Sequence, residues 1–443
     1  MDGDVTPAET ETALRGDTSF RPPDPAPFVD PAPFVAAGRA LDAAGVRWCR
    51  LRERGEGSED DLLIDAADLR AARCALAAEG WRERRHSGHG SHRAFHGYDP
   101  AVDRWSKIDL VTSLDYGRWQ EWRSGLAAGC LARSEPVDGG RHLAADDAFW
   151  TLLLHELLDR PGTAPRRAER LRDLAGAARD DGPGARAIAS LLLRRWRPAE
   201  VIRAAASEDP APLADLRRVL AAALARRPSA ISRRLASRVL RWIDHRDPPF
   251  LREGRTVALL GPDGAGKSSL AQLIGRGGPM ARQSIYLGLY GGSRGGAGKV
   301  HVPGISLARR LAAMWRSWLL GWWQARRGRL VIFDRHPYDA RLGGSGGFGG
   351  RVRRAILGHA LPAPDVVIVL DAPAELLYAR KPEHPLDRIE SQRRRYLALA
   401  DRLDRAIVVD ANRPLDDVAR QITAIAWDGA RATGGQTTVE RRR

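Results

Sequence analysis

The 443-residue sequence has very little lysine for so basic a chain. Only four of its 71 basic residues are lysines, so arginine carries almost the whole of the formal net charge of +16. This bias, together with 45 glycines, indicates a GC-rich coding background rather than selection for nucleic acid. Charge of this kind supports only salt-sensitive binding that ignores base sequence, so no specific nucleic acid partner is expected.

Cysteine and long apolar runs are scarce as well. The three cysteines, Cys49, Cys74 and Cys130, lie at irregular spacings that exclude a disulfide framework and a paired-thiol metal site. No run of about 18 uncharged apolar residues exists, so no membrane span is expected. Residues 1–30 are acidic and proline-rich and lack the order of a secretory signal, which predicts a soluble cytoplasmic protein.

The length predicts more than one hydrophobic core. Changes in pattern along the chain divide it into a disordered lead-in at 1–30, a small α+β domain at 31–143, a helical region with a proline-containing hinge at 144–250, an α/β domain at 251–430, and a disordered tail at 431–443.

In the first domain, we expect helices at 35–45 and 66–80 and strands at 46–53, 60–65, 81–85, 92–98 and 105–111. In the last domain, short apolar strands at 256–260, 330–334, 366–371 and 406–410 alternate with helical stretches. This alternation is typical of a parallel sheet covered by helices.

The sharpest motif is GPDGAGKSS, which directly follows the first of these apolar strands and precedes a helix. Gly261, Gly266, Lys267 and Ser268 match the pattern of a phosphate-binding loop. In such a loop, backbone N–H groups converge on phosphate oxygens, the lysine reaches the terminal phosphates, and the hydroxyl ligates Mg²⁺. The candidate binding residues for ATP and Mg²⁺ are Gly261, Gly264, Ala265, Gly266, Lys267, Ser268 and Ser269.

Two further patterns fit the same chemistry. Asp334 and Arg335 end the strand at 330–334, where the carboxylate could hold Mg²⁺ and the guanidinium could stabilise a transferring phosphoryl group. Arg380, Lys381 and Arg388 surround a proline-rich interruption between helices, as expected of a lid that closes over phosphates.

Together GPDGAGKSS, FDRHPYD, the lid segment and VVDANRPLDDVARQI resemble the thymidylate kinase family over about residues 254–430. The resemblance implies a P-loop kinase fold with a five-stranded parallel sheet, an acceptor-orienting role for Asp263, and a catalytic arginine from the lid, either Arg380 or Arg388. The family's Arg-Glu-Pro-Gly-Gly acceptor segment is absent, and SIYLGLYGGSRGGAGKVHVPG stands in its place. The resemblance therefore supports ATP-dependent phosphoryl transfer better than it supports a particular acceptor.

The first domain resembles the nucleotidyltransferase fold, because a Gly-Ser turn precedes Glu59 and Asp61 on one strand and Asp109 lies on another. Three carboxylates at one sheet edge could hold Mg²⁺ for attack on a nucleotide. An active transferase, an inactive relic and an unrelated α+β domain all stay open.

Two groups of residues have competing interpretations. His86, His89, His92 and His96 could bind a metal, but a hairpin of solvated imidazoles fits them better, and His155 is expected in the core. The basic, tryptophan-rich segment at 305–329 could lie on a membrane surface, but a buried tryptophan wall beside the acceptor pocket is the favoured interpretation. The segment at 231–246 is similarly periodic.

The sequence as a whole predicts ATP-dependent phosphoryl transfer to a nucleoside monophosphate such as dTMP, or to a related phosphate or sugar acceptor. The alternatives are an ATP-binding regulatory protein and a bifunctional protein with an N-terminal nucleotidyltransferase. The oligomeric state is left open between monomer and homodimer.

Overall fold

The structure is a computed structural model. It describes residues 32–52, 59–137, 140–160, 165–192, 195–246, 253–287, 305–342 and 347–428. The expected lead-in at 1–30, the tail at 431–443 and much of the expected hinge lie outside these residues, as does most of the segment that replaces the acceptor motif.

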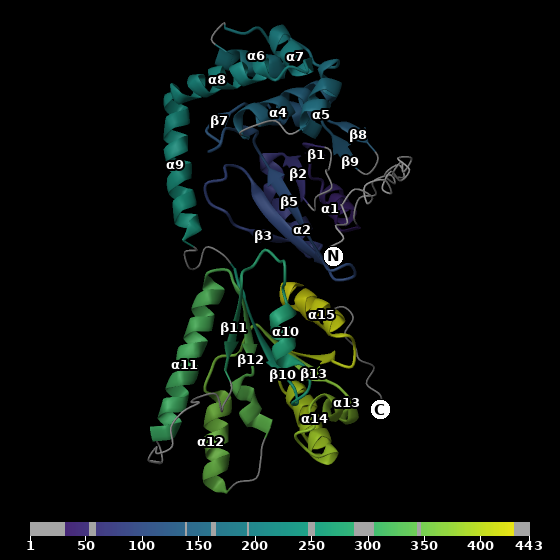
Figure 1. Ribbon diagram of the computed structural model, residues 1–443, viewed down its shortest axis with the longest axis vertical. Coiled ribbons are helices and arrows are strands. Elements are labelled where there is room, and N and C mark those ends of the chain that lie inside the picture. The colour runs from purple at the N-terminus through teal and green to yellow at the C-terminus, as the bar shows by residue number, and fades with distance from the viewer. Residues whose placement is uncertain are drawn as a thin grey trace, which may run out of the picture.

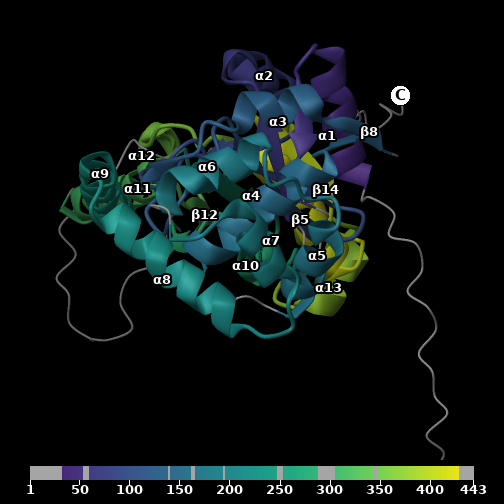
Figure 2. The same ribbon diagram turned by 90° about the horizontal axis from the view of Figure 1, so that it is seen from above.

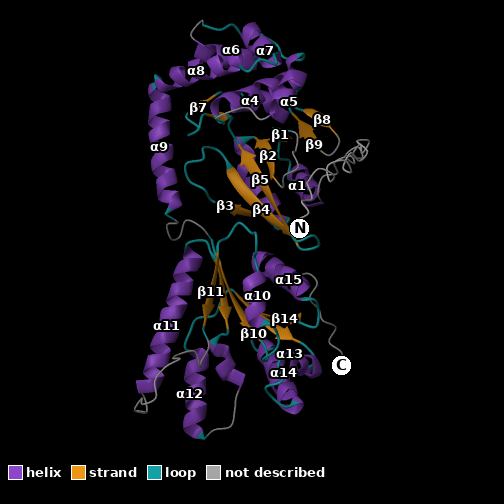
Figure 3. Ribbon diagram, viewed as in Figure 1, coloured by secondary structure: helices purple, strands orange, loops and turns teal. Residues whose placement is uncertain are grey.

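The N-terminal unit is built on a mixed seven-stranded sheet (Figures 1 and 3). Its strand order is β3-β4-β5-β2-β1-β9-β8, with β2 parallel to β5 and antiparallel to β1. The strands are β1 (Trp48–Arg50), β2 (Glu59–Ile64), β3 (Arg82–Arg84), β4 (Arg93–Asp99), β5 (Arg104–Val111), β8 (Glu135–Val137) and β9 (Gly140–His142). The five expected strands are present, whereas β8, β9 and the two-residue strands β6 (Asp115–Tyr116) and β7 (Trp122–Arg123) were not predicted.

Helices cover both faces of this sheet because side chains alternate along its strands. Leu62, Ile64 and Ile108 pack on one face with α1 (Ala32–Ala43) and α2 (Leu69–Ala78), which follows the 3₁₀ turn η1 (Ala66–Asp68). Leu63 and Val111 point to the other face and pack with α4 (Ala145–Leu158). The helical region therefore shares a core with the sheet.

The remaining helices of this half lie beyond α4 or at the edge of the sheet. They are α3 (Ala127–Arg133), α5 (Pro165–Ala175), α6 (Pro183–Leu192), α7 (Pro198–Ala206), α8 (Ala211–Ala225) and α9 (Pro228–His245). The long α9 runs along one flank of the molecule toward the C-terminal unit (Figure 1).

The C-terminal unit contains the expected parallel sheet, with five strands in the order β11-β12-β10-β13-β14. The strands are β10 (Arg255–Leu260), β11 (Arg282–Tyr286), β12 (Leu330–Asp334), β13 (Val366–Asp371) and β14 (Ala406–Asp410). Four of them were predicted from their apolar runs. The edge strand β11 has a polar start and only one buried side chain, so its pattern gave no signal.

Side chains along β10, β12 and β13 point alternately to the two faces of this sheet, so helices cover both faces. Val257, Leu259 and Ile332 pack with α10 (Lys267–Leu273), α13 (Ala374–Arg380) and α15 (Leu415–Asp428). Ala258 and Phe333 face α11 (Ile305–Arg326) and α12 (Phe348–His359). Val367 and Val369 face α14 (Leu386–Ala400), and the 3₁₀ helix η2 (Pro337–Leu342) follows β12.

The two units meet at an aromatic contact. Trp105 of β5 and Trp427 of α15 make an edge-on pair with ring centroids 4.9 Å apart. Trp427 Nε1 donates to the Gly80 carbonyl at 3.2 Å, and Arg84 Nη1 donates to the Gly328 carbonyl at 3.0 Å. The phosphate-loop unit is thus anchored on β5 and on the turn that follows α2.

Candidate functional site

The loop between β10 and α10 takes a path that only glycine can follow. Gly261, Gly264 and Gly266 have φ angles of 145°, 87° and 87°. A Cβ at Gly264 would lie 2.7 Å from the Leu377 carbonyl oxygen, and one at Gly261 would lie 2.8 Å from the Leu370 carbonyl oxygen. Gly261 and Gly264 are therefore fixed by close packing as well as by backbone conformation, and Gly266 by backbone conformation.

Lys267 lies under this loop and is only 7% exposed. Its Nζ donates to the carbonyls of Gly261 and Pro262, both at 2.7 Å, and lies 3.9 Å from Asp263 Oδ1. Burial, and then repulsion from Arg335, lower the pKa of Lys267 to about 8, against the opposing effect of nearby aspartates. A buried ammonium held mainly by carbonyl oxygens is well placed to exchange them for phosphate oxygens.

Ser268 and Asp334 meet at the carboxyl end of two neighbouring parallel strands. Pairing of β10 with β12 sets Leu259 opposite Asp334, and Ser268 follows the loop that leaves β10. Ser268 Oγ donates to Asp334 Oδ2 at 2.7 Å. A hydroxyl beside a carboxylate supplies the hard oxygen donors that Mg²⁺ prefers.

Arg335 has a positive φ of 74°, which is uncommon for a residue with a side chain. Its Nη2 donates to Asp263 Oδ1 at 2.7 Å. Burial acts to raise the pKa of Asp263, but Lys267, Arg335 and Lys381 outweigh it and hold that pKa below its usual value. Unusual backbone angles of this kind are tolerated where the surroundings fix them, often at functional sites.

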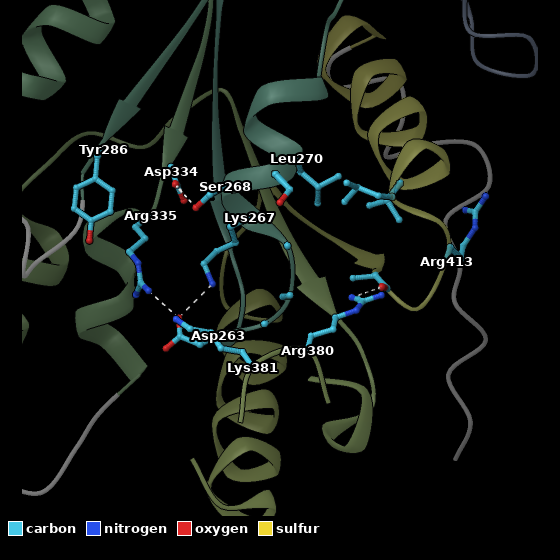
Figure 4. Close-up of a pocket in the computed structure, with 17 residues that line it drawn as sticks. Asp263, Lys267, Ser268, Leu270, Tyr286, Asp334, Arg335, Arg380, Lys381 and Arg413 are labelled. Carbon is cyan, nitrogen blue, oxygen red and sulfur yellow. Dashed lines mark hydrogen bonds and ion pairs between the residues drawn. The ribbon is translucent and has the colours of Figure 1, made fainter. Parts of the chain in front are cut away.

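These groups line one cavity of 590 Å³ (Figure 4). Tyr286 and Arg335 lie on one side of Lys267, and Arg380 and Arg413 lie on the other. Arg380 Nη1 donates to the Ala411 carbonyl at 3.1 Å, and Lys381 also lines the cavity.

Arg388, the other lid candidate, is exposed on α14 and is absent from the described residues that line the cavity. Of the two lid arginines, the structure brings only Arg380 to the loop. Every other candidate residue of the C-terminal unit lines the cavity except Gly261, whose carbonyl holds Lys267.

Sequence reasoning missed several groups near this site. Tyr286 is 50% exposed at the end of the edge strand β11, Arg413 lies just before the last helix, and Leu415 begins that helix. Asp339 accepts a hydrogen bond from the Tyr396 hydroxyl at 3.0 Å, and burial raises its pKa to about 6. The FDRHPYD segment contains Asp339, but only folding of η2 onto α14 pairs it with Tyr396.

The three carboxylates of the N-terminal unit do not form the expected metal site. Strand pairing sets Asp61 opposite Asp109, but Lys107 lies opposite Glu59. Lys107 Nζ is 2.8 Å from Asp109 and 3.7 Å from Glu59, and Arg52 is 3.3 Å from Asp61. Within the described ranges, no three His, Cys, Asp or Glu side chains are arranged to hold a metal ion.

The histidines do not form the solvated hairpin that the sequence favoured, because only His86 of the four is exposed and His89, His92 and His96 are half-buried. His86 is 3.7 Å from Asp244, and burial lowers the pKa of His89 and His96 to about 4. Partial burial also lowers the pKa of the half-buried His92. His155 is buried as expected, with Nδ1 2.7 Å from Asp159 Oδ2.

The expected tryptophan wall beside the acceptor pocket is wrong. Among the residues described, no side chain of α11 lines the phosphate-loop cavity. Trp318 packs on the sheet, whereas Trp315 and Trp323 are 41% and 43% exposed.

No protein-family model matches the chain. Similar solved structures include a thymidylate kinase from Candida albicans, with 17% identity, a TM-score of 0.30, and coverage of 39% of this chain and 91% of that one. A deoxyadenosine kinase from M. mycoides with bound dATP has 15% identity, a TM-score of 0.28, and coverage of 38% of this chain and 96% of that one.

Proposed function

We propose that the C-terminal unit is an ATP-dependent phosphotransferase that acts on a small acceptor. The observation that carries this proposal is the convergence of a glycine-only loop, a buried lysine, a Ser–Asp oxygen pair and two arginines on one cavity. A regulatory nucleotide site needs the loop and the lysine, but it does not need Arg335 on the far side of the lysine from Arg380.

The residues fit ATP and Mg²⁺. Bound MgATP would supply the phosphoryl group and a divalent cation. Lys267 would leave the carbonyls of Gly261 and Pro262 and hold phosphate oxygens, while Ser268 and Asp334 would hold the cation. Arg335 and Arg380 would stabilise negative charge that develops during transfer.

The acceptor would enter on the side of Tyr286, Asp263 and Arg335. An exposed aromatic ring, a carboxylate and a guanidinium can bind a ring, a hydroxyl and a phosphate respectively. These groups suit a nucleoside monophosphate such as dTMP, or a related phosphate or sugar acceptor. We propose this acceptor class and no single member of it.

One observation favours a regulatory role as the second candidate. Arg413 lines both the phosphate-loop cavity and a cavity of 1210 Å³ that contacts both units. Nucleotide binding could therefore change contacts with the N-terminal unit. An ATP-dependent phosphorylated product detected by mass spectrometry, across a panel of nucleotides and sugar phosphates, would rule out a purely regulatory role.

The Lys267→Ala variant tests the main proposal. We expect turnover to fall by about 10²-fold or more, since preorganised charged contacts to a transferring group are of this size. Product formation from labelled ATP is the measurement. Lys107→Ala, which removes a lysine of the N-terminal unit, is the matched control and should keep activity.

The proposal fails if the wild-type protein binds ATP but yields no product with any acceptor of the panel. It also fails if Lys267→Ala retains the wild-type rate.

A further inference from the structure

Exposed apolar side chains are concentrated on three helices. Thirteen of the nineteen large apolar side chains exposed among the described residues lie on α9, α11 and α12. On α9 they are Ile231, Leu235, Val239, Leu240, Trp242 and Ile243; on α11, Trp315, Leu319, Leu320 and Trp323; on α12, Phe348, Val352 and Ile356. We call these thirteen residues the apolar flank.

The helix α9 has an apolar face that points to solvent. Two of its four arginines face the protein: Arg234 Nη2 is 3.0 Å from Glu121 Oε1, and Arg241 Nε donates to the Gly88 carbonyl at 2.9 Å. Leu235, Val239 and Trp242, which recur at helical spacing, face outward and are 56–58% exposed. If α9 packed only on this protein, its apolar side chains would be expected to face the protein.

The helix α11 has apolar side chains on two neighbouring faces. Leu311, Met314 and Trp318 pack on the sheet, while Trp315, Leu319 and Trp323 lie about 100° further round the helix and are 41–49% exposed. An apolar face of a helix is normally covered. The described residues cover only the face that packs on the sheet.

All three helices lie on the same flank of the molecule. In Figure 1, α9 and α11 follow one another along the long axis with α12 beside them, and Figure 2 shows the three gathered at one corner in the view from above. Their exposed faces therefore extend over both units.

The charge of the three helices indicates which kind of partner would cover the apolar flank. They contain eleven arginines and a single acidic residue, Asp244, which is 7% exposed. Arg234 and Arg241 face the protein, and the other nine keep the three helices strongly positive. A second copy would set one positive surface against another. Anionic lipid headgroups carry the complementary charge, and tryptophan and arginine side chains suit the boundary between headgroups and acyl chains.

We propose that the apolar flank binds the surface of an anionic lipid bilayer, with α9, α11 and α12 lying along it. No helix in the described part of the chain is long and apolar enough to cross a membrane. Contact with the surface alone is consistent with that length, because each helix needs to insert only one face. The phosphate-loop cavity contains no residue of the flank.

Flotation with lipid vesicles tests this proposal. The full chain is mixed with phosphatidylcholine vesicles, or with vesicles in which about a third of the lipid is phosphatidylglycerol, at low salt and at about 0.5 M salt. We expect binding to the anionic vesicles only, weakened by salt.

Two variants localise the contact. The α11 variant changes Trp315, Leu319 and Trp323 to serine. The α9 variant changes Leu235 and Trp242 to serine. Each should weaken vesicle binding by about tenfold or more, because the buried apolar area is lost. The matched control changes Val102 and Val137 of the N-terminal unit, which are 61% and 50% exposed, to serine. Circular dichroism checks that all variants are folded.

Three results would overturn the proposal. The wild-type protein could fail to bind anionic vesicles, or the flank variants could bind as well as the control. The protein could also sediment as a dimer that the α11 variant dissociates, which would make the flank an interface between two copies.

Discussion

At the scale of single residues, the site depends on how a few buried charges are paired. Four charged residues, Lys267, Arg335, Asp263 and Asp339, shift one another's pKa values, and hydrogen bonds of 2.7–3.0 Å orient each of them. The first three were named from the sequence, whereas the role of Asp339 depends on its environment.

Asp339 gives a prediction on stability. Burial raises its pKa from the usual 3.8 to about 6, while Lys267, the Tyr396 hydroxyl and Arg335 act to lower it and Asp263 acts to raise it. Because the folded state binds the proton more tightly, stability falls as pH rises between these two values. Asp339→Asn cannot ionise and still accepts from Tyr396, so it should raise the free energy of unfolding at pH 7 by about 3 kcal/mol.

Denaturant unfolding at a series of pH values measures this effect. The difference between Asp339→Asn and wild type should disappear below about pH 4, where the carboxyl is neutral in both states. If the difference in unfolding free energy between the two proteins does not change with pH, the folded state does not disfavour the ionised form of Asp339.

The two lid arginines give a second residue-scale prediction, which depends on the proposed function. Arg380→Ala should lower kcat by about 10²-fold, the usual cost of losing a charged contact to the transferring group. Arg388→Ala removes an exposed arginine outside the cavity and should behave as wild type. Equal losses in steady-state assays of the two variants would mean that the lid closes differently during turnover.

At the scale of elements, strand endings bring the site together. Parallel pairing of β10 and β12 places the phosphate loop beside Asp334, and Leu377 of α13 packs closely against Gly264. The apolar runs of the central strands predicted this sheet because both of its faces are buried. The short polar strand β11, which brings Tyr286 to the cavity, has no such run.

Gly264→Ala tests the loop as an element. Its Cβ would meet the Leu377 carbonyl at 2.7 Å in a backbone conformation that disfavours a side chain, so the loop must move. We expect nucleotide affinity to fall by about tenfold or more, measured by calorimetry, because steric conflict is added to backbone strain. Gly277→Ala, with φ +69° and open space around it, is the control for strain alone. It should cost only about 1 kcal/mol of stability and leave affinity unchanged.

At the scale of the whole molecule, the two units are joined by a few specific contacts rather than by one continuous core. Trp427 belongs to the core of the C-terminal unit, and Trp105 packs against that same core from the N-terminal unit. Nearby, a cavity of 820 Å³ separates parts of the two surfaces.

A double-mutant cycle on Trp105 and Trp427 measures this coupling. Each change to alanine should destabilise the protein, and the pair should show a coupling energy of about 0.5–1.5 kcal/mol, as edge-on aromatic pairs do. Additive effects in thermal unfolding would indicate that the two units unfold without support from this contact.

The sequence by itself determined where the phosphate-loop motif of the C-terminal unit lies and which four apolar strands build most of its sheet. It could do so because a phosphate loop and buried parallel strands are local patterns, set by residues adjacent in the chain. The N-terminal acids formed a comparable pattern, but Lys107 pairs with Asp109 on its own strand and with Glu59 on the neighbouring strand, and Arg52 pairs with Asp61. The contact with Glu59 depends on the pairing of β2 with β5, which spacing along the chain does not reveal.

Tertiary structure decided the rest. It brought Arg380 but not Arg388 to the cavity, added Tyr286 and Asp339 to the surroundings of the site, and left apolar side chains of α9, α11 and α12 exposed. Helical periodicity predicts that a helix has an apolar face, but only packing determines whether that face points into the core or away from it.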